Sequence, residues 1–539
     1  MNKIIYTVLT ALMVIAALSS CSDFLDKEPK TELSPNTFWK TESDLRFGLN
    51  SLYANMNRSY TIDNQSIDCF AAIGNPVSSG TYTASNTDGI WTTAYNNIRV
   101  VCDFLENYDK AEVSDAVKAR YRGEALFFKA YFYFNLIKRF GDVPYADHTL
   151  DLASEELYGP RIDKRQILDI ILADLAEAEA AVPQKSAMKN DLGRITKGAI
   201  QALTARIALY FGTWYKYHGG ADGTQYLAIA RDAARRLMDS NEYSIYPDYR
   251  NLFLLPGEDS SEHILSFRYS DETSSYNARI RGVIVDFIQD PTKHLADAFL
   301  CKDGLPIGKS AYTVEYLPLG KEFDNRDPRM ALTIWRPGDP FRNEAFVPNL
   351  ANQTKTGYMF KKYGDEDSYA NIQSKIDEIL IRYAEVLITY AEATYELDGS
   401  ISDADLDISV NTIRDRFAGN PNCLPHLTNA FATAHGLDML EEIRRERRVE
   451  LCSESLRYDD LIRWKTAEHE LPQSILGAKF DAGSYPALTT GKDIILNADG
   501  FILVQDGNSR TFDPAKDYLF PLPLREVRLN PQLTQNPGW

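Results

Sequence analysis

Apolar residues recur at helical spacing along two long stretches of the chain. Within residues 116–140, Leu126, Ala130, Phe134 and Ile137 fall on one face of a predicted helix. The same spacing predicts further helices at about 165–182, after the cap residue Thr196, and at about 226–238, 377–397, 404–417, 437–452 and 456–467. Helix hairpins of this length resemble tetratricopeptide units, whose period is about 34 residues. The pattern therefore predicts a mainly α, helical-repeat scaffold.

The stretches between the helices have a different pattern. Residues 57–90, 212–224, 241–370 and 470–539 are rich in Gly, Pro, Asn, Asp, Ser and Tyr, which is typical of loops and short strands. Residues 494–504 read as a β-hairpin that turns at Asp-Gly. Because long loops in a compact protein are usually functional, we expect the helices to form the scaffold and the loops to carry the working surface.

The first residues predict where the protein is found. Fifteen mostly apolar residues from Ile4 to Leu18 form a signal that is too short to span a bilayer of about 30 Å. The next residues, Leu18-Ser19-Ser20-Cys21, resemble the bacterial lipobox, in which the cysteine is acylated and becomes the new N-terminus. We therefore expect a signal peptide at 1–20, a lipidated tether at 21–35 and one domain at 36–539, with helical pairs at about 116–240 and 377–467. Acyl chains on Cys21 would hold that domain on a membrane.

Composition narrows the partners and the chemistry. The chain of 539 residues has a formal net charge of −18, which repels phosphate backbones and argues against nucleic acid. The cysteines after Cys21 are scattered, without CxxC spacing, so we expect buried thiols in place of a disulfide framework or a zinc site; they are Cys69, Cys102, Cys301, Cys423 and Cys452. Aromatic residues are abundant, with 31 Tyr and 25 Phe.

The chain carries no motif typical of an enzyme or a cofactor site. It contains neither a GxSxG elbow nor an HExxH pair. Residues 304–310 imitate a phosphate loop but are one residue short, so a turn is predicted. The alternating Asp residues at 403, 405 and 407 imitate the start of a calcium loop, but Ile408 replaces the required Gly, and a helix capped by Ser402 explains them better. We predict no enzymatic activity, no cofactor and no metal.

Several local sequences resemble one family. Residues 122–136 followed by Gly141-Asp142-Val143-Pro144 are similar to a signature of the SusD/RagB family of outer-membrane nutrient-binding lipoproteins. Further similar segments are residues 202–214, 382–385 with 390–393, 411–414, 447–451 with 457–464, 518–523 and 530–539. The resemblance runs from the lipobox to the last residue. The departures are small: Ser455 stands where the family usually has Gly, and Phe24-Leu25 interrupts the acidic residues after Cys21.

The resemblance implies a function. It implies a tetratricopeptide-like scaffold, anchored in the outer membrane and facing the cell exterior. The scaffold would capture oligosaccharides and form a lid over a SusC-like TonB-dependent transporter. Two alternatives stay open. A helical-repeat surface can bind peptides or proteins, and the many acidic residues could include a glycosidase pair.

The motifs themselves have mainly structural interpretations. Arg447, Arg448 and Arg457 lie among glutamates at i,i+3 and i,i+4 spacing, which predicts a salt-bridged helix pair in preference to a basic binding patch. The aromatic run at 127–134 is predicted to be core.

Ligand contacts are predicted on the irregular segments. Sugars need aromatic rings for their C–H faces and amides, carboxylates or Arg for their hydroxyls. The candidates, chosen by their polar surroundings, are Asp63, Asn64, Asp68, Tyr82, Trp91, Tyr269, Tyr276, Trp335 and Arg382. Three have a structural alternative: Trp91 opens a helix and Trp335 follows two apolar residues, so either could be core. Arg382 could instead pair with Glu385.

Overall fold

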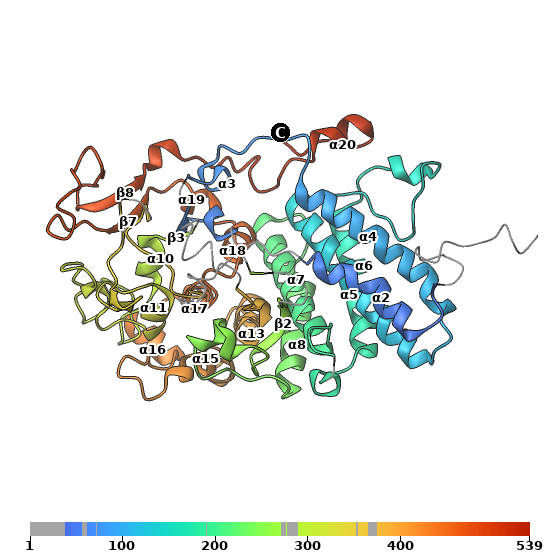
Figure 1. Ribbon diagram of the computed structural model, residues 1–539, viewed down its shortest axis with the longest axis horizontal. Helices are drawn as coiled ribbons and strands as arrows, with labels where there is room; N and C mark the ends of the chain where they lie inside the picture. The colour runs from blue at the N-terminus through green and yellow to red at the C-terminus, as the bar shows by residue number, and fades with distance from the viewer. Residues whose placement is uncertain are drawn as a thin grey trace, which may run out of the picture.

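The computed structural model describes eight stretches of the chain. They are residues 38–56, 62–71, 73–189, 191–270, 276–277, 289–351, 354–364 and 374–539. The predicted signal, Cys21 and the whole of the predicted tether lie outside the described residues. Long helices fill one side of the molecule, and the other side is built from loops, short helices and two-stranded ribbons (Figure 1). The predicted fold class, mainly α with long irregular segments, is confirmed.

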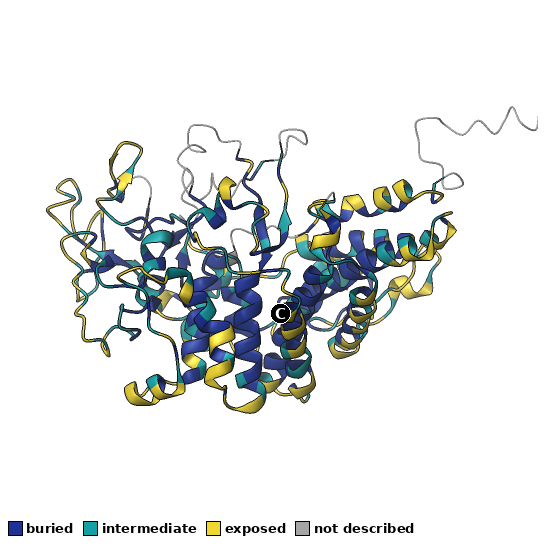
Figure 2. Cartoon of the chain, turned by 90° about the horizontal axis from the view of Figure 1, so that it is seen from below, coloured by how far each residue is buried: buried dark blue, intermediate teal, exposed yellow. Residues whose placement is uncertain are grey.

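The scaffold is a continuous series of antiparallel helix contacts. In order of the chain, its long helices are α2 (Glu42–Ala54), α4 (Gly89–Asn107), α5 (Asp115–Phe140), α6 (Lys164–Ala181), α7 (Lys197–His218), α8 (Thr224–Asp239), α13 (Tyr383–Asp398) and α17 (Met439–Glu450). Each of α4 to α8 packs on the next, α8 packs on α13, and α13 packs on α17. Buried residues concentrate where these helices meet (Figure 2).

Glycines allow the closest of these contacts. A Cβ on Gly212 of α7 would lie 2.8 Å from Leu227 Cγ of α8, and a Cβ on Gly123 of α5 would lie 2.6 Å from Val182 Cγ2, just after α6. Any larger residue would push the helices apart. The two glycines therefore allow the short distance between neighbouring helices.

The irregular side is held by short elements. The ribbons are antiparallel and pair β1 (Cys69–Phe70) with β3 (Asp290–Pro291), β2 (His263–Phe267) with β6 (Glu378–Arg382), β4 (Pro340–Phe341) with β5 (Glu344–Ala345), and β7 (Ile475–Lys479) with β8 (Phe501–Gln505). The short helices are α3 (Pro76–Ser79), α10 (Lys293–Ala298), α11 (Pro328–Thr333), α14 (Asp403–Leu406), α15 (Thr412–Arg414), α16 (Asn429–His435), α18 (Arg457–Arg463), α19 (Ala467–Glu470) and α20 (Leu524–Leu529). A second hydrophobic core lies beneath them.

Three of the predicted helices have different bounds. The segment predicted at 377–397 begins as strand β6, because Glu378–Arg382 pairs with β2 before α13 starts. The helix predicted at 404–417 is broken into α14, a π-helical turn, α15 and a final 3-10 turn. The helix predicted at 456–467 stops at Arg463, and Lys465 has a left-handed φ of 59°. By contrast, α2 was not predicted, and of α4 only a helix start at Trp91 was, in the alternative interpretation of that residue.

Smaller predictions are confirmed. Residues 497–501 form the turn of a hairpin, although the main partner of β8 is the distant strand β7. Residues 304–310 form a turn, in which the Ser310 hydroxyl donates to Asp303. Ser402 caps α14 by accepting from the backbone N–H of Asp405. The five described cysteines are unpaired thiols. Among the described residues, none of the helices is both long and apolar enough to cross a membrane.

Candidate functional site

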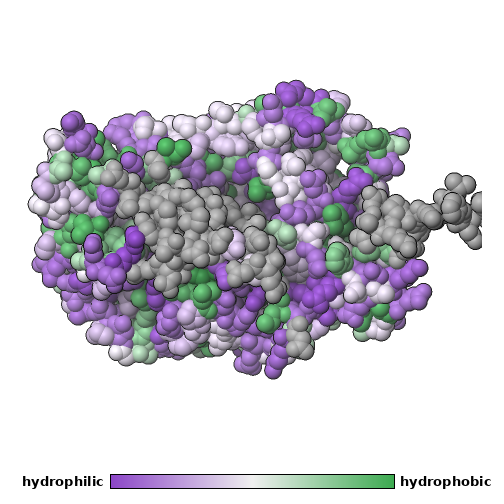
Figure 3. Space-filling view, in the orientation of Figure 1, coloured by the Kyte–Doolittle hydropathy of each residue, from purple (hydrophilic) through white to green (hydrophobic). Residues whose placement is uncertain are grey.

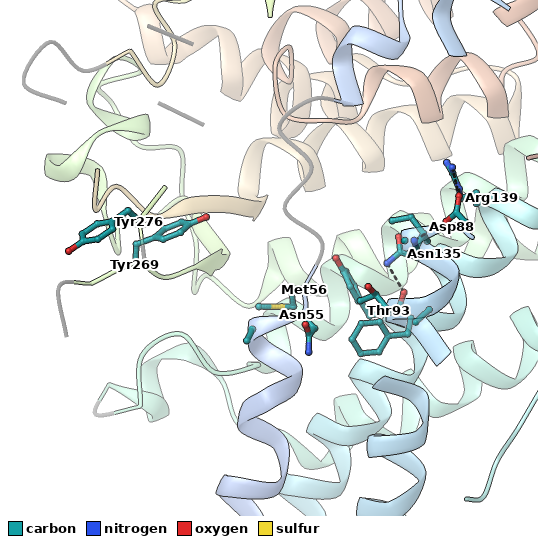
Figure 4. A pocket seen from close by; sticks show the side chains of 14 residues that line it. Asn55, Met56, Asp88, Thr93, Asn135, Arg139, Tyr269 and Tyr276 are labelled. Carbon is teal, nitrogen blue, oxygen red and sulfur yellow. Dashed lines mark hydrogen bonds and ion pairs between the residues drawn. The ribbon is translucent and has the colours of Figure 1, made fainter. Parts of the chain in front are cut away.

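A cleft of about 590 Å³ opens between the helical scaffold and the loop side. One wall comes from the C-terminal end of α2, the first turns of α4 and the C-terminal half of α5, and the other from the segment after β2 (Figure 4). Its described lining residues are Ala54, Asn55, Met56, Asp88, Gly89, Ile90, Thr93, Ala94, Tyr131, Phe132, Asn135, Arg139, Tyr269 and Tyr276.

Helix α5 supplies one face of this cleft. Tyr131, Asn135 and Arg139 follow each other at i,i+4 spacing, so their side chains lie along one stripe of the helix. Most of the other residues in this part of α5 are buried in the core. The Asn135 amide donates to the Tyr131 carbonyl at 3.0 Å, which orients its planar group along the cleft wall. The stripe therefore offers an aromatic ring beside an oriented amide.

The start of α4 fixes the far end of the cleft. One Asp88 oxygen caps α4 by accepting from the backbone N–H of Ile90 at 2.8 Å and of Trp91 at 3.2 Å. The other oxygen accepts from Arg139 Nη2 at 2.8 Å (Figure 4). The Arg139 guanidinium also lies over the Phe520 ring. These contacts hold Arg139 rigidly, as a binding site requires of its polar groups.

Tyrosines after β2 form the opposite wall. Tyr269 and Tyr276 lie beyond Met56 and Asn55 as seen from α5 (Figure 4). The Tyr269 backbone N–H donates to Asp377 Oδ1 at 3.0 Å, and its ring contacts Phe267 with centroids 5.1 Å apart. Between the walls, the Asn55 amide donates to Asn97 Oδ1 at 3.0 Å. Rings and planar amides thus face the cleft from both sides.

The chemistry of this lining suits binding. The described lining residues include one carboxylate, Asp88, and it is committed to Arg139 and to the α4 cap. A glycosidase site of the usual kind needs two carboxyl groups flanking the bond to be cleaved. The described residues also form no cluster of His, Cys, Asp and Glu that could hold a metal ion.

Two of the predicted ligand contacts, Tyr269 and Tyr276, lie in the cleft. Three other aromatic candidates do not line it. Trp91 is buried against Tyr95 and Phe140, so its alternative interpretation as core describes its position. Trp335 is buried in a separate cluster with Phe341 and Phe346. Tyr82 is half-buried against Phe520 and Trp539 near the C-terminus.

The acidic and amide candidates are buried in polar contacts. Asp63 Oδ2 accepts from the Ser455 backbone N–H at 3.1 Å, and Asn64 Oδ1 accepts from the Asn75 amide at 2.6 Å. Asp68 pairs with Arg448 and Arg457. Although burial alone would raise the pKa of Asp68, the two arginines lower it. Asp63 and Asp68 join segments that are far apart in the sequence, and Asn64 holds the nearby Asn75, so their prediction as ligand contacts is corrected to a structural role.

Arg382 needs the same correction. Its guanidinium is 1% exposed and pairs with Glu262, Glu450 and Glu454, each at 2.7 Å. It does not pair with Glu385, which instead binds Arg206. A side chain enclosed by three carboxylates has no surface to offer a ligand. The sequence placed Arg382 on a predicted helix, whereas it ends strand β6, and its three carboxylate partners come from distant segments.

The sequence contains a pattern that could have identified some of the cleft residues that were not predicted. Tyr131 lies in the aromatic run predicted to be core, and the run is core apart from this residue. Tyr131, Asn135 and Arg139 form a polar stripe at i,i+4 spacing in a helix end whose other residues, apart from Lys138, are mostly aromatic or aliphatic. A polar stripe on a helix that is otherwise packed in the core indicates a face that lines a cavity or is exposed to solvent. Asn55 and Thr93 carry no comparable signal, since exposed polar residues at helix ends are common.

The fold and the cleft together define a helical-repeat scaffold that carries a polar, aromatic binding cleft. Two family models match the chain: one described as "SusD family" over residues 261–539, and one described as "Starch-binding associating with outer membrane" over residues 23–209. The chain belongs to the SusD family.

Relatives and solved structures agree with this assignment. A SusD-like carbohydrate binding protein from Bacteroides fragilis is 26% identical with a TM-score of 0.78, and the match covers 92% of this chain and 100% of that one. Surface glycan-binding protein A from Bacteroides uniformis has a TM-score of 0.64 at 18% identity, covering 92% of this chain and 99% of that one, and shares the fold. A SusD-like protein of Formosa agariphila is 25% identical over 504 residues, 85% of this chain and 90% of the relative.

Proposed function

We propose that this protein binds oligosaccharides in the cleft between α5 and the segment after β2. The observation that carries the proposal is the meeting of three tyrosine rings and two amides, from elements far apart in the sequence, around one cavity of about 590 Å³. Tyrosine rings cover the C–H faces of sugar rings, and amides and guanidinium groups bind hydroxyls. The similarity to the B. fragilis protein named as carbohydrate binding supports the same function.

The proposed contacts are Tyr131, Asn135, Tyr269 and Tyr276. Tyr269 and Tyr276 are retained from the sequence, and the other two come from the structure. By analogy with base stacking on aromatic side chains, each ring that stacks on a sugar contributes about 1–3 kcal/mol. Arg139 is held by Asp88 and by the Phe520 ring, so its contribution is a fixed hydrogen-bond donor.

Calorimetry against a panel of oligosaccharides tests this proposal. Tyr131→Ala and Tyr276→Ala should each weaken the binding of a glycan by about 5- to 150-fold, which corresponds to about 1–3 kcal/mol. Tyr312→Ala is the matched control, because Tyr312 is an exposed loop tyrosine that does not line the cleft. If the folded cleft variants bind as tightly as the wild type, the site lies elsewhere. New reducing ends in the mixture would show an enzyme.

The finer role is also a proposal. The protein would be anchored in the outer membrane through acylated Cys21, face the exterior and deliver its ligand to a SusC-like TonB-dependent transporter. Its support is the lipobox-like sequence and the matched family model described as associating with the outer membrane. Such a barrel should co-purify in mild detergent. A chain that leaves native membranes as a monomer and binds peptides, not glycans, would favour the alternative of a peptide-binding scaffold.

A further inference from the structure

A second cavity of about 320 Å³ adjoins the cleft, with which it shares Ala54 and Met56. Its described lining residues include three arginines, Arg46, Arg194 and Arg268, and no carboxylate. The whole chain, by contrast, has a net charge of −18. On the face seen in Figure 3, hydrophilic and hydrophobic residues are interspersed around the atoms drawn in grey. The three arginines around this one cavity therefore contrast with the negative charge of the chain as a whole. We call this cavity the arginine subsite.

Arg194 is held at the base of the arginine subsite. Its Nη2 donates to Glu124 Oε2 at 2.6 Å, and its Nη1 donates to Asn50 Oδ1 at 3.0 Å. Its guanidinium also lies over the Tyr53 ring, 5.0 Å from the centroid. Glu124 is fully buried and does not line the cavity. Arg194 is thus neutralised from the protein side while its edge contributes to the cavity wall.

Arg46 and Arg268 stand at the more open part of the wall. Arg46 pairs with Asp191 at 2.8 Å, and its side chain is 50% exposed. Arg268 Nη2 donates to Asp259 Oδ2 at 3.1 Å. The stem of Arg268 lies across Gly193, where φ is +85° and a Cβ would lie only 2.6 Å from Arg268 Cδ. Glycine at this position therefore lets the arginine stem lie close to the backbone, while its guanidinium pairs with Asp259.

We propose that the arginine subsite binds an acidic group of the glycan held in the neighbouring cleft, either the carboxylate of a uronic acid or a sulfate ester. This inference rests on the proposed function and adds the class of oligosaccharide. Carboxylate and sulfate oxygens accept paired hydrogen bonds from the planar guanidinium, which makes arginine the favoured residue for such anions. The partner carboxylates of the three arginines do not line the cavity, so none of the described lining residues opposes an incoming anion with a carboxylate.

Binding of an acidic glycan by a negatively charged protein requires arginine side chains held close to the ligand. A strongly negative protein repels an acidic glycan at long range, although salt screens that repulsion beyond about 8–10 Å. Selection for an acidic sugar then depends on short-range, oriented donors. The shared residues Ala54 and Met56 place those donors next to the cleft, so one oligosaccharide can occupy both cavities.

Matched pairs of oligosaccharides test the inference on the full chain. The probes are oligomers of galacturonate, oligomers of glucuronate and N-acetylhexosamine, and sulfated galactose oligomers. Each is compared with its neutral counterpart, prepared by carboxyl reduction or by desulfation. At least one acidic form should bind about tenfold more tightly than its counterpart, which corresponds to about 1.4 kcal/mol. The uronate and sulfate arms distinguish the two sources of the anion.

Variants test whether a preference for acidic over neutral oligosaccharides arises at the arginine subsite. Arg46→Gln and Arg268→Gln should each remove most of the preference for the acidic form while leaving the affinity for the neutral form unchanged. Arg235→Gln is the matched control, because Arg235 is 46% exposed and ion-paired with Asp239 on α8, away from both cavities. The inference is overturned if neutral and acidic forms bind equally, or if the preference survives in both variants; glycan binding itself would then still stand. If no glycan of either kind binds, the proposed function fails, and this inference with it.

Discussion

Replacing Arg382 by methionine tests whether the buried ion network holds the loop side onto the scaffold. Arg382 ends strand β6 and pairs with Glu262, Glu450 and Glu454. The surrounding network contains five cationic and five anionic side chains, all nearly or fully buried; the cationic ones are Arg329, Lys362, Arg382, Arg414 and Arg416, and the anionic ones are Glu262, Asp327, Glu446, Glu450 and Glu454. Methionine keeps much of the volume and removes the charge.

The expected loss of stability follows from this balance. Removing one partner of a buried ion pair typically costs about 3–5 kcal/mol, because an uncompensated charge remains. Here three carboxylates lose a shared partner but each keeps another cationic one, so we expect a loss within that range. Arg235→Met, which removes an exposed ion pair on α8, should cost at most about 1 kcal/mol.

The pH dependence adds a second signature. Burial alone would raise the pKa of Glu454, but Arg382 and Lys362 lower it to about 2. A lowered carboxyl pKa contributes stability above its unfolded value of about 4.5 and loses it as the pH falls toward 2. Without Arg382, Glu454 takes up a proton at higher pH. The difference in stability between wild type and Arg382→Met should therefore narrow as the pH falls below about 4.5.

Urea unfolding followed by tryptophan fluorescence measures both effects. Wild type, Arg382→Met and Arg235→Met are compared at neutral pH and at pH values below 4.5. An Arg382→Met protein within about 1 kcal/mol of wild type would refute the structural role. A variant of unchanged stability that no longer binds glycan would instead return Arg382 to the ligand site.

Three further predictions concern other groups. Burial raises the pKa of Asp290 to about 8, so the contribution of Asp290 to wild-type stability should fall as the pH rises from about 4 to 8. In urea titrations the difference in stability between Asp290→Asn and wild type should therefore change over this range, and a constant difference would show that Asp290 makes no such contribution. Burial lowers the pKa of His263 to about 4, so the unfolded state alone takes up its proton below about 6.5. The contribution of His263 to stability should drop by up to about 3 kcal/mol between pH 6.5 and 4, and His263→Gln should lose less stability over this range than wild type; an equal change in the variant contradicts the assignment. Mass spectrometry of the mature protein should find an acylated N-terminal Cys21, and Cys21→Ala should leave the protein unprocessed or released from the membrane; an unmodified N-terminus elsewhere would exclude the anchor.

Local pattern predicted the helices with strong periodicity. The long helices α5, α6 and α8 begin and end within a few residues of their predicted bounds, because capping residues and an apolar face are properties of the local sequence. Helix α7 begins after its predicted cap Thr196 but continues to His218, through residues predicted to be irregular. Helix α2 carried the same kind of signal, a Thr41 capping box followed by Leu45, Leu49 and Leu52 at helical spacing, and was missed. The local sequence therefore contained enough information to predict α2.

Local sequence pattern could not predict which distant segments of the chain pair with each other. Residues 378–382 look like the start of a helix, but they form a strand because β2 lies beside them. The predicted salt-bridged helix pair around Arg447 and Arg448 does contain buried ion pairs. However, Arg447 pairs with Asp460 and Arg448 with Asp68, which lies 380 residues away. Spacing of i,i+4 predicted that these charges would be neutralised but not by which partners.

The sequence by itself determined the scaffold, the resemblance to the SusD family and the predicted lipid anchor, since each depends on residues that are close together in the chain. The tertiary structure decided which polar residues face an open cavity. Arg382 and Asp68 share the polar character of Asn135 and Arg46, yet the first two are enclosed by charges of opposite sign and the last two line cavities. Burial depends on what the rest of the chain brings alongside a residue, and that information is not local.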